Sequence, residues 1–348
     1  MRKLLLVITS ICIITMLQAQ VSKTVNVTTA GTLSMLLTEH EDSTVTNLTV
    51  TGTIDSLDFI TMHNMSVLSV LDLSGAKCTR IPNSAFHKSK LTSIIIPTSV
   101  TSIGNDAFTD CYLLTKITIP ESVISIGIGA FFQCYGLTSI TLPSTLTSIG
   151  ESTFVLDSSL TSIIIPASVT SIGNDAFQCC LGLKSIAIPS SVTSIGYNAL
   201  SGCISLASII LPSSITSIPV GAFEGCSGLT SITLPLSVNT IEDYAFSGCN
   251  GLTSIIIPSS VTSIGESAFD GCSGLKSVII PSSITSIGSY IFNGCSRLTS
   301  VSISSSDTSI GQGAFSLCSN LTTFSIPSSV TSIGESAFNG DSLLQSFQ

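Results

Sequence analysis

Tryptophan is absent from this chain of 348 residues, histidine occurs three times, and only 9% of the residues are charged. All three histidines (His40, His63 and His87) precede the repeats described below, so the repeats carry no imidazole for a Ser–His–acid set or a zinc site. Lys and Arg total 11 against 20 Asp and Glu, a net charge of −9. We therefore expect no nucleic-acid partner.

Long apolar runs are also missing outside the N-terminus, although 44% of the residues are hydrophobic. Residues 1–19 read MRKLLLVITSICIITMLQA, in which two basic residues precede an apolar core and Ala19 offers a small residue for cleavage. This pattern predicts a secretory signal peptide, with a retained membrane anchor as the alternative. Elsewhere Ser, Thr and Pro break the apolar runs, so we expect no transmembrane segment after cleavage.

The dominant feature that is present is a tandem repeat of 23 residues without insertion or deletion. A fixed period in this range predicts a solenoid. A twelfth copy begins at Leu344, and residues 344–348 are interpreted as the start of a truncated repeat. The eleven full copies begin at Leu91, Leu114, Leu137, Leu160, Leu183, Leu206, Leu229, Leu252, Leu275, Leu298 and Leu321.

Within each unit, here numbered 1 to 23, the apolar residues have fixed places. In Leu252–Gly274 the apolar places shared with the other units are positions 1, 4, 6, 10, 13, 17 and 18, Ile256 adds an apolar residue at position 5, and Cys is at 21. Positions 4 and 6 alternate with Ser or Thr, which predicts a strand, and Pro at 7 ends it. Positions 8 to 13 form a second extended run, and Gly at 14 allows a tight corner. A single unit cannot bury its apolar residues alone, so the coils must stack.

The remainder of the chain is divided as follows. Residues 20–67 are predicted to be an N-terminal cap that seals the open end of the core, and Leu57–Met65 within it looks helical. Residues 68–90 echo the unit with a one-residue shift and are interpreted as a degenerate first coil. The solenoid is thus predicted to span residues 68–343, as one degenerate and eleven regular repeats.

Cysteine has a regular place in the repeat, because nine of the twelve occupy position 21. In a secreted protein disulfides are the first hypothesis. One column of equally spaced thiols favours instead free, buried cysteines that pack as small hydrophobic side chains, with Cys179 and Cys180 as the exception most open to pairing. This structural column comprises Cys111, Cys134, Cys180, Cys203, Cys226, Cys249, Cys272, Cys295 and Cys318.

The spacing LxxIxI at positions 1, 4 and 6 resembles the leucine-rich repeat, and the pattern LTSIxIPSSVTSIGxxAFxxCxx resembles the BspA-like class of bacterial cell-surface proteins. The resemblance covers residues 68–343. It implies a β-rich, right-handed solenoid with a parallel β-sheet on one face. It also implies an exported, secreted or cell-surface adhesin that binds protein or glycoprotein ligands, such as host matrix or plasma glycoproteins, or other cells.

No motif for catalysis, a cofactor or a metal is found, so we expect a protein that is not an enzyme. Acidic residues near positions 15–16 and 19–20 suggest a solvated edge, with calcium binding as the alternative.

The predicted binding surface is the outward side of the first strand, at positions 3 and 5. Its alternative interpretation is that these residues are merely good strand formers. A second candidate patch consists of Tyr112 and Tyr135, because aromatic side chains anchor interfaces. Protein binding is the leading hypothesis; a carbohydrate-binding module and a passive spacer of the cell envelope are the alternatives. The strand-face residues are Ser93, Ile95, Lys116, Thr118, Ser139, Thr141, Ser162, Ile164, Ser185, Ala187, Ser208, Ile210, Ser231, Thr233, Ser254, Ile256, Ser277, Ile279, Ser300, Ser302, Thr323 and Ser325.

Overall fold

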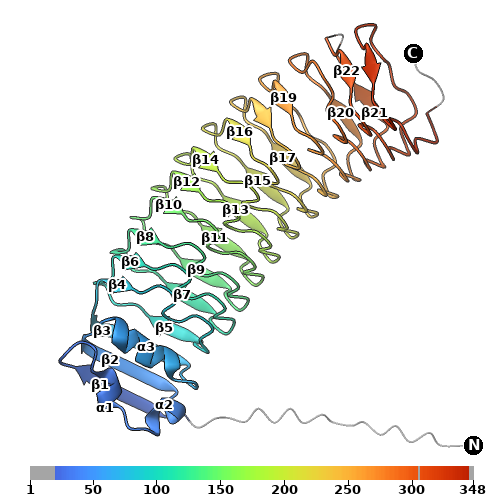
Figure 1. Cartoon of the computed structure of the whole chain (residues 1–348). Helices are drawn as coiled ribbons and strands as arrows, with labels where there is room; N and C mark the ends of the chain where they lie inside the picture. The colour runs from blue at the N-terminus through green and yellow to red at the C-terminus, as the bar shows by residue number, and fades with distance from the viewer. Residues whose placement is uncertain (1–19, 305, 345–348) are drawn as a thin grey trace, which may run out of the picture.

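The computed structural model describes residues 20–304 and 306–344, which form one curved rod of about 14 turns (Figure 1). Each turn is one coil of a parallel β-solenoid, so the predicted fold is confirmed. The predicted signal peptide and residues 345–348 of the truncated repeat lie outside the described residues. Within the described ranges, no helix is long and apolar enough to cross a membrane.

The first extended run of the unit forms a ladder of short parallel strands along the rod, which hydrogen bonding divides into several sheets. In these strands the central residue points into the core and its two neighbours point outward, as the alternation of Ile with Ser or Thr predicts. The coil at residues 252–274 follows the ladder without an assigned strand in this run. The strands are β5 (Ser93–Ile95), β7 (Lys116–Thr118), β9 (Ser139–Thr141), β11 (Ser162–Ile164), β13 (Ser185–Ala187), β15 (Ser208–Ile210), β17 (Ser231–Thr233), β20 (Ser277–Ile279) and β21 (Ser300–Ser302).

The second extended run forms another ladder, which ends at the corner of the coil at position 14. Its strands are two residues long, and their Ile side chains face the core, apart from Ile333 in the last of them, which is exposed. These strands are β4 (Arg80–Ile81), β6 (Ser102–Ile103), β8 (Ser125–Ile126), β10 (Ser148–Ile149), β12 (Ser171–Ile172), β14 (Ser194–Ile195), β16 (Ser217–Ile218), β18 (Thr240–Ile241), β19 (Ser263–Ile264), β22 (Ser309–Ile310) and β23 (Ser332–Ile333).

The register follows the sequence period. Ser162 pairs with Ser185 and Ile163 with Ile186, so partners are one 23-residue unit apart. Between β4 and β6 the offset is one residue shorter, because Ile81 pairs with Ile103. This is the one-residue shift seen in the sequence of residues 68–90. Equal unit length therefore places the same side chain of each coil in one column.

The N-terminal part continues the same sheet with longer strands. The order is β1 (Ser22–Val27), β2 (Asn47–Thr53), β3 (Val70–Lys77) and β5, all parallel. Short helices α1 (Leu33–Leu36) and α2 (Glu41–Thr44) lie between β1 and β2, and α3 (Ser56–Asn64) lies between β2 and β3. The division between residues 20–67 and 68–343 stays a prediction; the strand ladder runs through it without a break.

Helix α3 begins one residue before the predicted helical stretch, and its start has a clear cause. Asp55 caps it, and Asp58 closes a capping box by accepting the Asp55 N–H at 2.9 Å. The buried Asp58 carboxylate also accepts the N–H groups of Gly31 at 2.7 Å and Leu33 at 2.9 Å. Three backbone donors satisfy this buried side chain and tie α3 to the segment before α1.

Positions 15 to 20 form the third side of each coil as a hydrogen-bonded turn. The N–H groups of Asp106, Phe108 and Asp110 donate to carbonyls of the next coil at 2.9, 2.8 and 2.8 Å. Asp106 and Asp110 adopt left-handed backbone conformations, with φ of 55° and 61°. Such residues turn alternate N–H groups toward the neighbouring coil, so the turns also stack as a ladder.

Glycine at position 14 has a different role from the predicted tight corner. A Cβ on Gly196 would lie 2.4 Å from the backbone nitrogen of Asn174 in the preceding coil, and its φ is not in the left-handed region. The glycine is therefore required by close approach of successive coils rather than by backbone conformation. Gly150 is an exception, because the atom nearest to its Cβ would be 3.2 Å away.

The core between the three sides consists of single-residue columns. Phenylalanines at position 18 stack with ring centroids 5.3 to 5.7 Å apart, as from Phe108 to Phe131 and from Phe131 to Phe154. Leu200 interrupts this column between Phe177 and Phe223. Stacked, buried rings and aliphatic columns explain why the rod needs no separate globular core.

Candidate functional site

The strand face combines isolated exposed isoleucines with small hydroxyl side chains. Positions 3 and 5 point outward in every coil, and of the 22 residues predicted for the strand face only Ser93 is half-buried. The exposed fractions are 84% for Ile164, 78% for Ile210 and 83% for Ile256. A residue at position 4, buried in every coil except at the half-buried Val301, lies beneath each pair and fixes its direction. The predicted orientation is thus observed, while the binding role stays a prediction.

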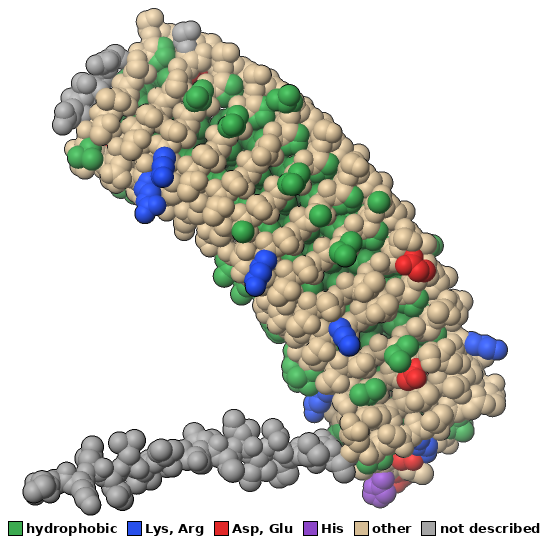
Figure 2. All heavy atoms as spheres, turned by 180° about the vertical axis from the view of Figure 1, so that it is seen from behind, with side chains coloured by type: hydrophobic (Ala, Val, Ile, Leu, Met, Phe, Trp, Pro, Cys, Tyr) green, Lys and Arg blue, Asp and Glu red, His purple; other side chains and the backbone are tan. Residues whose placement is uncertain are grey.

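The hydroxyl groups beside this face are held in place by the backbone. Thr138 Oγ1 donates to the Thr115 carbonyl at 2.9 Å, and Thr230 Oγ1 donates to the Ala207 carbonyl at 3.2 Å. Charge is sparse on this face, and Figure 2 shows a side of the rod on which hydrophobic side chains stand out in rows with few charged ones between them. In the part of the chain that the structure describes, the one ion pair, Lys23 to Glu41, lies far from these coils.

Two hollows lie on the strand face next to exposed isoleucines. One of about 450 Å³ is lined by Ile95, Lys116 and Thr118, and the second, of about 290 Å³, is lined by Thr141 and Ile164. Both occur where Thr occupies position 5, because the shorter side chain leaves space beside its Ile neighbour. The strand face therefore has protruding Ile side chains at position 5, called knobs below, and gaps over the small residues at that position.

The tyrosine patch is exposed but not stacked. Tyr112 is 47% and Tyr135 41% exposed, on successive coils, and Leu113 beside them is 41% exposed. The ring contacts of the described residues join phenylalanines only. The two tyrosines thus present separate rings along one edge of the rod.

The cysteine column is buried, and its thiols are free. Each of the nine donates from Sγ to the carbonyl of the position-18 residue in the preceding coil, at 3.0 to 3.3 Å. Burial raises the pKa of the Cys111, Cys226 and Cys272 thiols to about 12. The column is therefore a set of neutral donors that join neighbouring coils, which gives the repeated Cys a second physical role besides packing.

Asp157 takes the place of cysteine in this column and is fully buried. Its Oδ1 accepts the Cys134 N–H at 2.8 Å, while its Oδ2 has no partner among the described residues. Burial raises the pKa of this carboxyl well above its usual range. The sequence signal for this buried acid is the replacement of cysteine at position 21, which recurs at Asp341.

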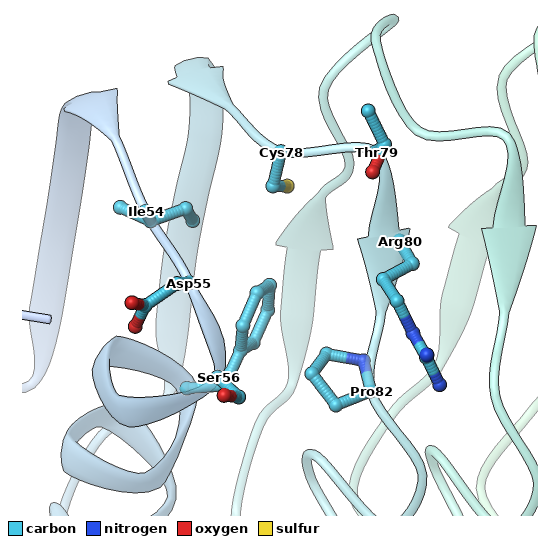
Figure 3. A pocket seen from close by; sticks show the side chains of 8 residues that line it. Ile54, Asp55, Ser56, Cys78, Thr79, Arg80 and Pro82 are labelled. Carbon is cyan, nitrogen blue, oxygen red and sulfur yellow. The ribbon is translucent and has the colours of Figure 1, made fainter. Parts of the chain in front are cut away.

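A cavity of about 400 Å³ near the N-terminal end was not anticipated from the sequence (Figure 3). It lies between helix α3 and strand β4, because α3 takes the place of the short second strand and does not pack flush against the next coil. Asp55 lies on the helix side, Arg80 on the strand side, and Cys78 at its end. Burial raises the pKa of the Cys78 thiol to about 11, so this thiol is a poor nucleophile at neutral pH.

Metal coordination has little support in the described ranges, where no group of three or more His, Cys, Asp or Glu side chains could hold an ion. The acidic residues near positions 15–16 and 19–20 are spread over separate coils, as expected for a solvated edge.

The repeats of residues 79–203, 153–259 and 239–348 match the family described as BspA type Leucine rich repeat region (6 copies), so the chain belongs to this family. A leucine-rich repeat protein from Bacteroides ovatus is 31% identical, with a TM-score of 0.53, over 71% of this chain and 81% of that chain. A leucine rich cell surface protein from Faecalibacterium prausnitzii is 32% identical, with a TM-score of 0.50, over 78% of this chain and 82% of that chain. None of the curated proteins matches the chain.

The family and fold carry a coarse functional statement. Leucine-rich repeat solenoids of this kind are typical of bacterial surface proteins, bind other proteins, and are typically not enzymes.

Proposed function

We propose that the protein is an exported, secreted or cell-surface adhesin that binds other proteins through its strand face. The observation that carries the proposal is the row of exposed isoleucines along the strand face, which carries little charge. Solenoids use such extended faces to bind partners, because each coil adds contact area without new folding cost. Apolar residues that stand alone among hydroxyl groups also suit a glycoprotein ligand, which offers both apolar and polar contacts.

The proposal is tested with the full chain and a panel of immobilised matrix and plasma glycoproteins. A triple variant Ile164→Lys, Ile210→Lys and Ile256→Lys places three buried charges in the interface and is expected to reduce binding at least 10-fold. The matched control is Ile124→Lys, because Ile124 is 61% exposed outside the strand face. Loss of binding in the control, or full binding by the triple variant, contradicts the proposal.

Carbohydrate binding is the second candidate, and one observation favours it. Tyr112 and Tyr135 present exposed rings on successive coils, and aromatic faces are common platforms for sugar rings. A glycan array probed with the full chain and with the variant Tyr112→Ser and Tyr135→Ser decides the question. Binding of a glycan by both proteins alike, or of none by either, removes the tyrosine patch as a sugar site.

A further inference from the structure

The pattern of large and small residues at position 5 has an internal symmetry. Numbering the coils from Leu91 as coil 1, Ile occupies coils 1, 4, 6, 8 and 9, and Ala, Ser or Thr occupies the other five of the first ten. When the column is read backward, every large residue coincides with a small one. The pairs are Ile95 with Ser302, Thr118 with Ile279, Thr141 with Ile256, Ile164 with Thr233, and Ala187 with Ile210.

We propose that the strand face binds a second copy of this chain in an antiparallel, face-to-face dimer. Its two-fold axis runs along the strand direction, between Ala187 and Ile210. Such an axis reverses the rod and places position 5 of each coil against position 5 of the opposing coil. This inference rests on the proposed function, since it assigns a partner to the same face.

The side chains fit this arrangement. Ile210 is 78% exposed and enters the gap over Ala187 of the second copy, while Ile164, 84% exposed, lies over Thr233. The adjacent knobs Ile256 and Ile279, 83% and 71% exposed, face two adjacent small residues. Those small residues are Thr118 and Thr141, which border the two hollows of the strand face.

One pair at position 8 fits the same symmetry. Leu236 at position 8 of coil 7 is 81% exposed and faces coil 4 of the second copy, where position 8 is Ala167. In a parallel dimer, each coil would face the same coil of the second copy. That arrangement would place Ile against Ile five times and leave the gaps unfilled. Complementary size in the five pairs at position 5 and in this pair at position 8 distinguishes the antiparallel dimer from non-specific apolar association.

The area is sufficient for a specific dimer. Ten coils at about 4.8 Å per strand span about 48 Å, and five residues at about 3.3 Å give a width of about 16 Å. The face therefore covers about 770 Å² per copy, close to the roughly 800 Å² per partner of a standard interface. Charge opposes the dimer: Lys184 in coil 5 comes near Lys184 of the second copy, and Lys116 in coil 2 of each copy comes near Lys276 in coil 9 of the other. Added salt is therefore expected to favour association.

The test is the dimer dissociation constant of the purified full chain, measured by analytical ultracentrifugation with four variants. Ala187→Ile fills the central gap and is expected to weaken the dimer at least 10-fold. Ile210→Ala removes the central knob and weakens it by about threefold or more. The double variant Ala187→Ile and Ile210→Ala exchanges the large and the small residue across the axis. Its dissociation constant is expected to lie within about threefold of that of the unchanged chain. Ile124→Lys, away from the face, serves as the control.

An amine cross-linker with a span of about 11 Å gives an independent readout. Antiparallel pairing brings Lys116 in coil 2 near Lys276 in coil 9 of the second copy, whereas within one chain seven coils, about 34 Å, separate them. A Lys116–Lys276 cross-link is the expected product, and a dominant Lys116–Lys116 product overturns the antiparallel arrangement.

The outcomes separate this inference from the proposed function. A chain that stays monomeric at about 100 µM, or that dimerises more tightly with Ala187→Ile, overturns the dimer. If the monomeric chain still binds glycoproteins and loses this binding in the Ile→Lys triple variant, the proposed function stands without the dimer. If the dimer forms and the panel captures nothing, the dimer stands and the ligand assignment fails.

Discussion

Replacing Asp157 by Cys should stabilise the rod, and the structure sets the size of the effect. Asp157 is fully buried with one carboxyl oxygen unpartnered among the described residues, and a buried, unsatisfied polar atom costs about 1–3 kcal/mol. A thiol at this position would donate to the Phe131 carbonyl, as the nine column cysteines donate to theirs. We therefore expect Asp157→Cys to raise the free energy of unfolding by about 1–3 kcal/mol where the acid is neutral.

The gain should increase with pH. The pKa of Asp157 is raised by burial in the folded state, so folding favours the protonated form. The stability of the unchanged chain is then greatest below the unfolded pKa of about 3.9, and it falls by about 1.4 kcal/mol per pH unit above it until the folded pKa is reached. Asp157→Asn keeps the shape of the side chain and removes this titration, so the difference between the two proteins isolates the effect of one residue.

Urea unfolding followed by circular dichroism between pH 4 and pH 8 measures both effects. Because long repeat arrays depart from two-state unfolding, amide exchange in the neighbouring coils should accompany it. Glu266→Gln, at an exposed acid, is the control and should leave the pH profile unchanged. The reasoning is refuted if Asp157→Cys is no more stable than the unchanged chain at pH 7, or if Asp157→Asn shows the same pH dependence.

Three further changes test the core and the coil contacts. Gly196→Ala should destabilise the rod by about 3 kcal/mol, because its Cβ would lie 2.4 Å from the backbone nitrogen of Asn174. Gly150→Ala should cost under about 1 kcal/mol, because its Cβ would lie 3.2 Å from Thr153 Oγ1. Thermal melting compares the two variants. Leu200→Phe should complete the ring column and add about 1–2 kcal/mol, as measured by urea unfolding; a lower stability would show that the site cannot hold a ring. Maleimide labelling of the native chain followed by mass spectrometry should modify the partly exposed Cys179, modify Cys78 more slowly because burial raises the pKa of its thiol to about 11, and leave the buried column unlabelled until urea is added.

Much of the fold could be predicted because one physical rule acts at every coil. Equal unit length places Ile163 beside Ile186 and each column thiol below the next, and Pro at position 7 marks the end of the first strand. The same period made the outward direction of positions 3 and 5 predictable, since side chains alternate along a strand. The helical stretch at residues 57–65 was also recognised, although its capping acids Asp55 and Asp58 were not.

Other features depend on contacts that no sequence pattern announces. The spacing from β1 to β2 is 25 residues without the LxxIxI signature, so the first turns of the sheet were not distinguishable from a separate cap. The cavity beside Arg80 arises from a helix next to a short strand, which is a property of packing. The close approach at Gly196 and the missing partner of Asp157 are likewise properties of neighbouring coils, which a single unit does not display.

Oxidative footprinting of the strand face tests the central claim most directly. Hydroxyl radicals label exposed aliphatic side chains. The label at each Ile can therefore be compared between the free chain and the chain bound to a glycoprotein of the panel. The account predicts that binding protects Ile164, Ile210 and Ile256 and leaves Ile124 and Ile128 as reactive as before. Protection of Ile124 and Ile128 with undiminished labelling of the other three would contradict it.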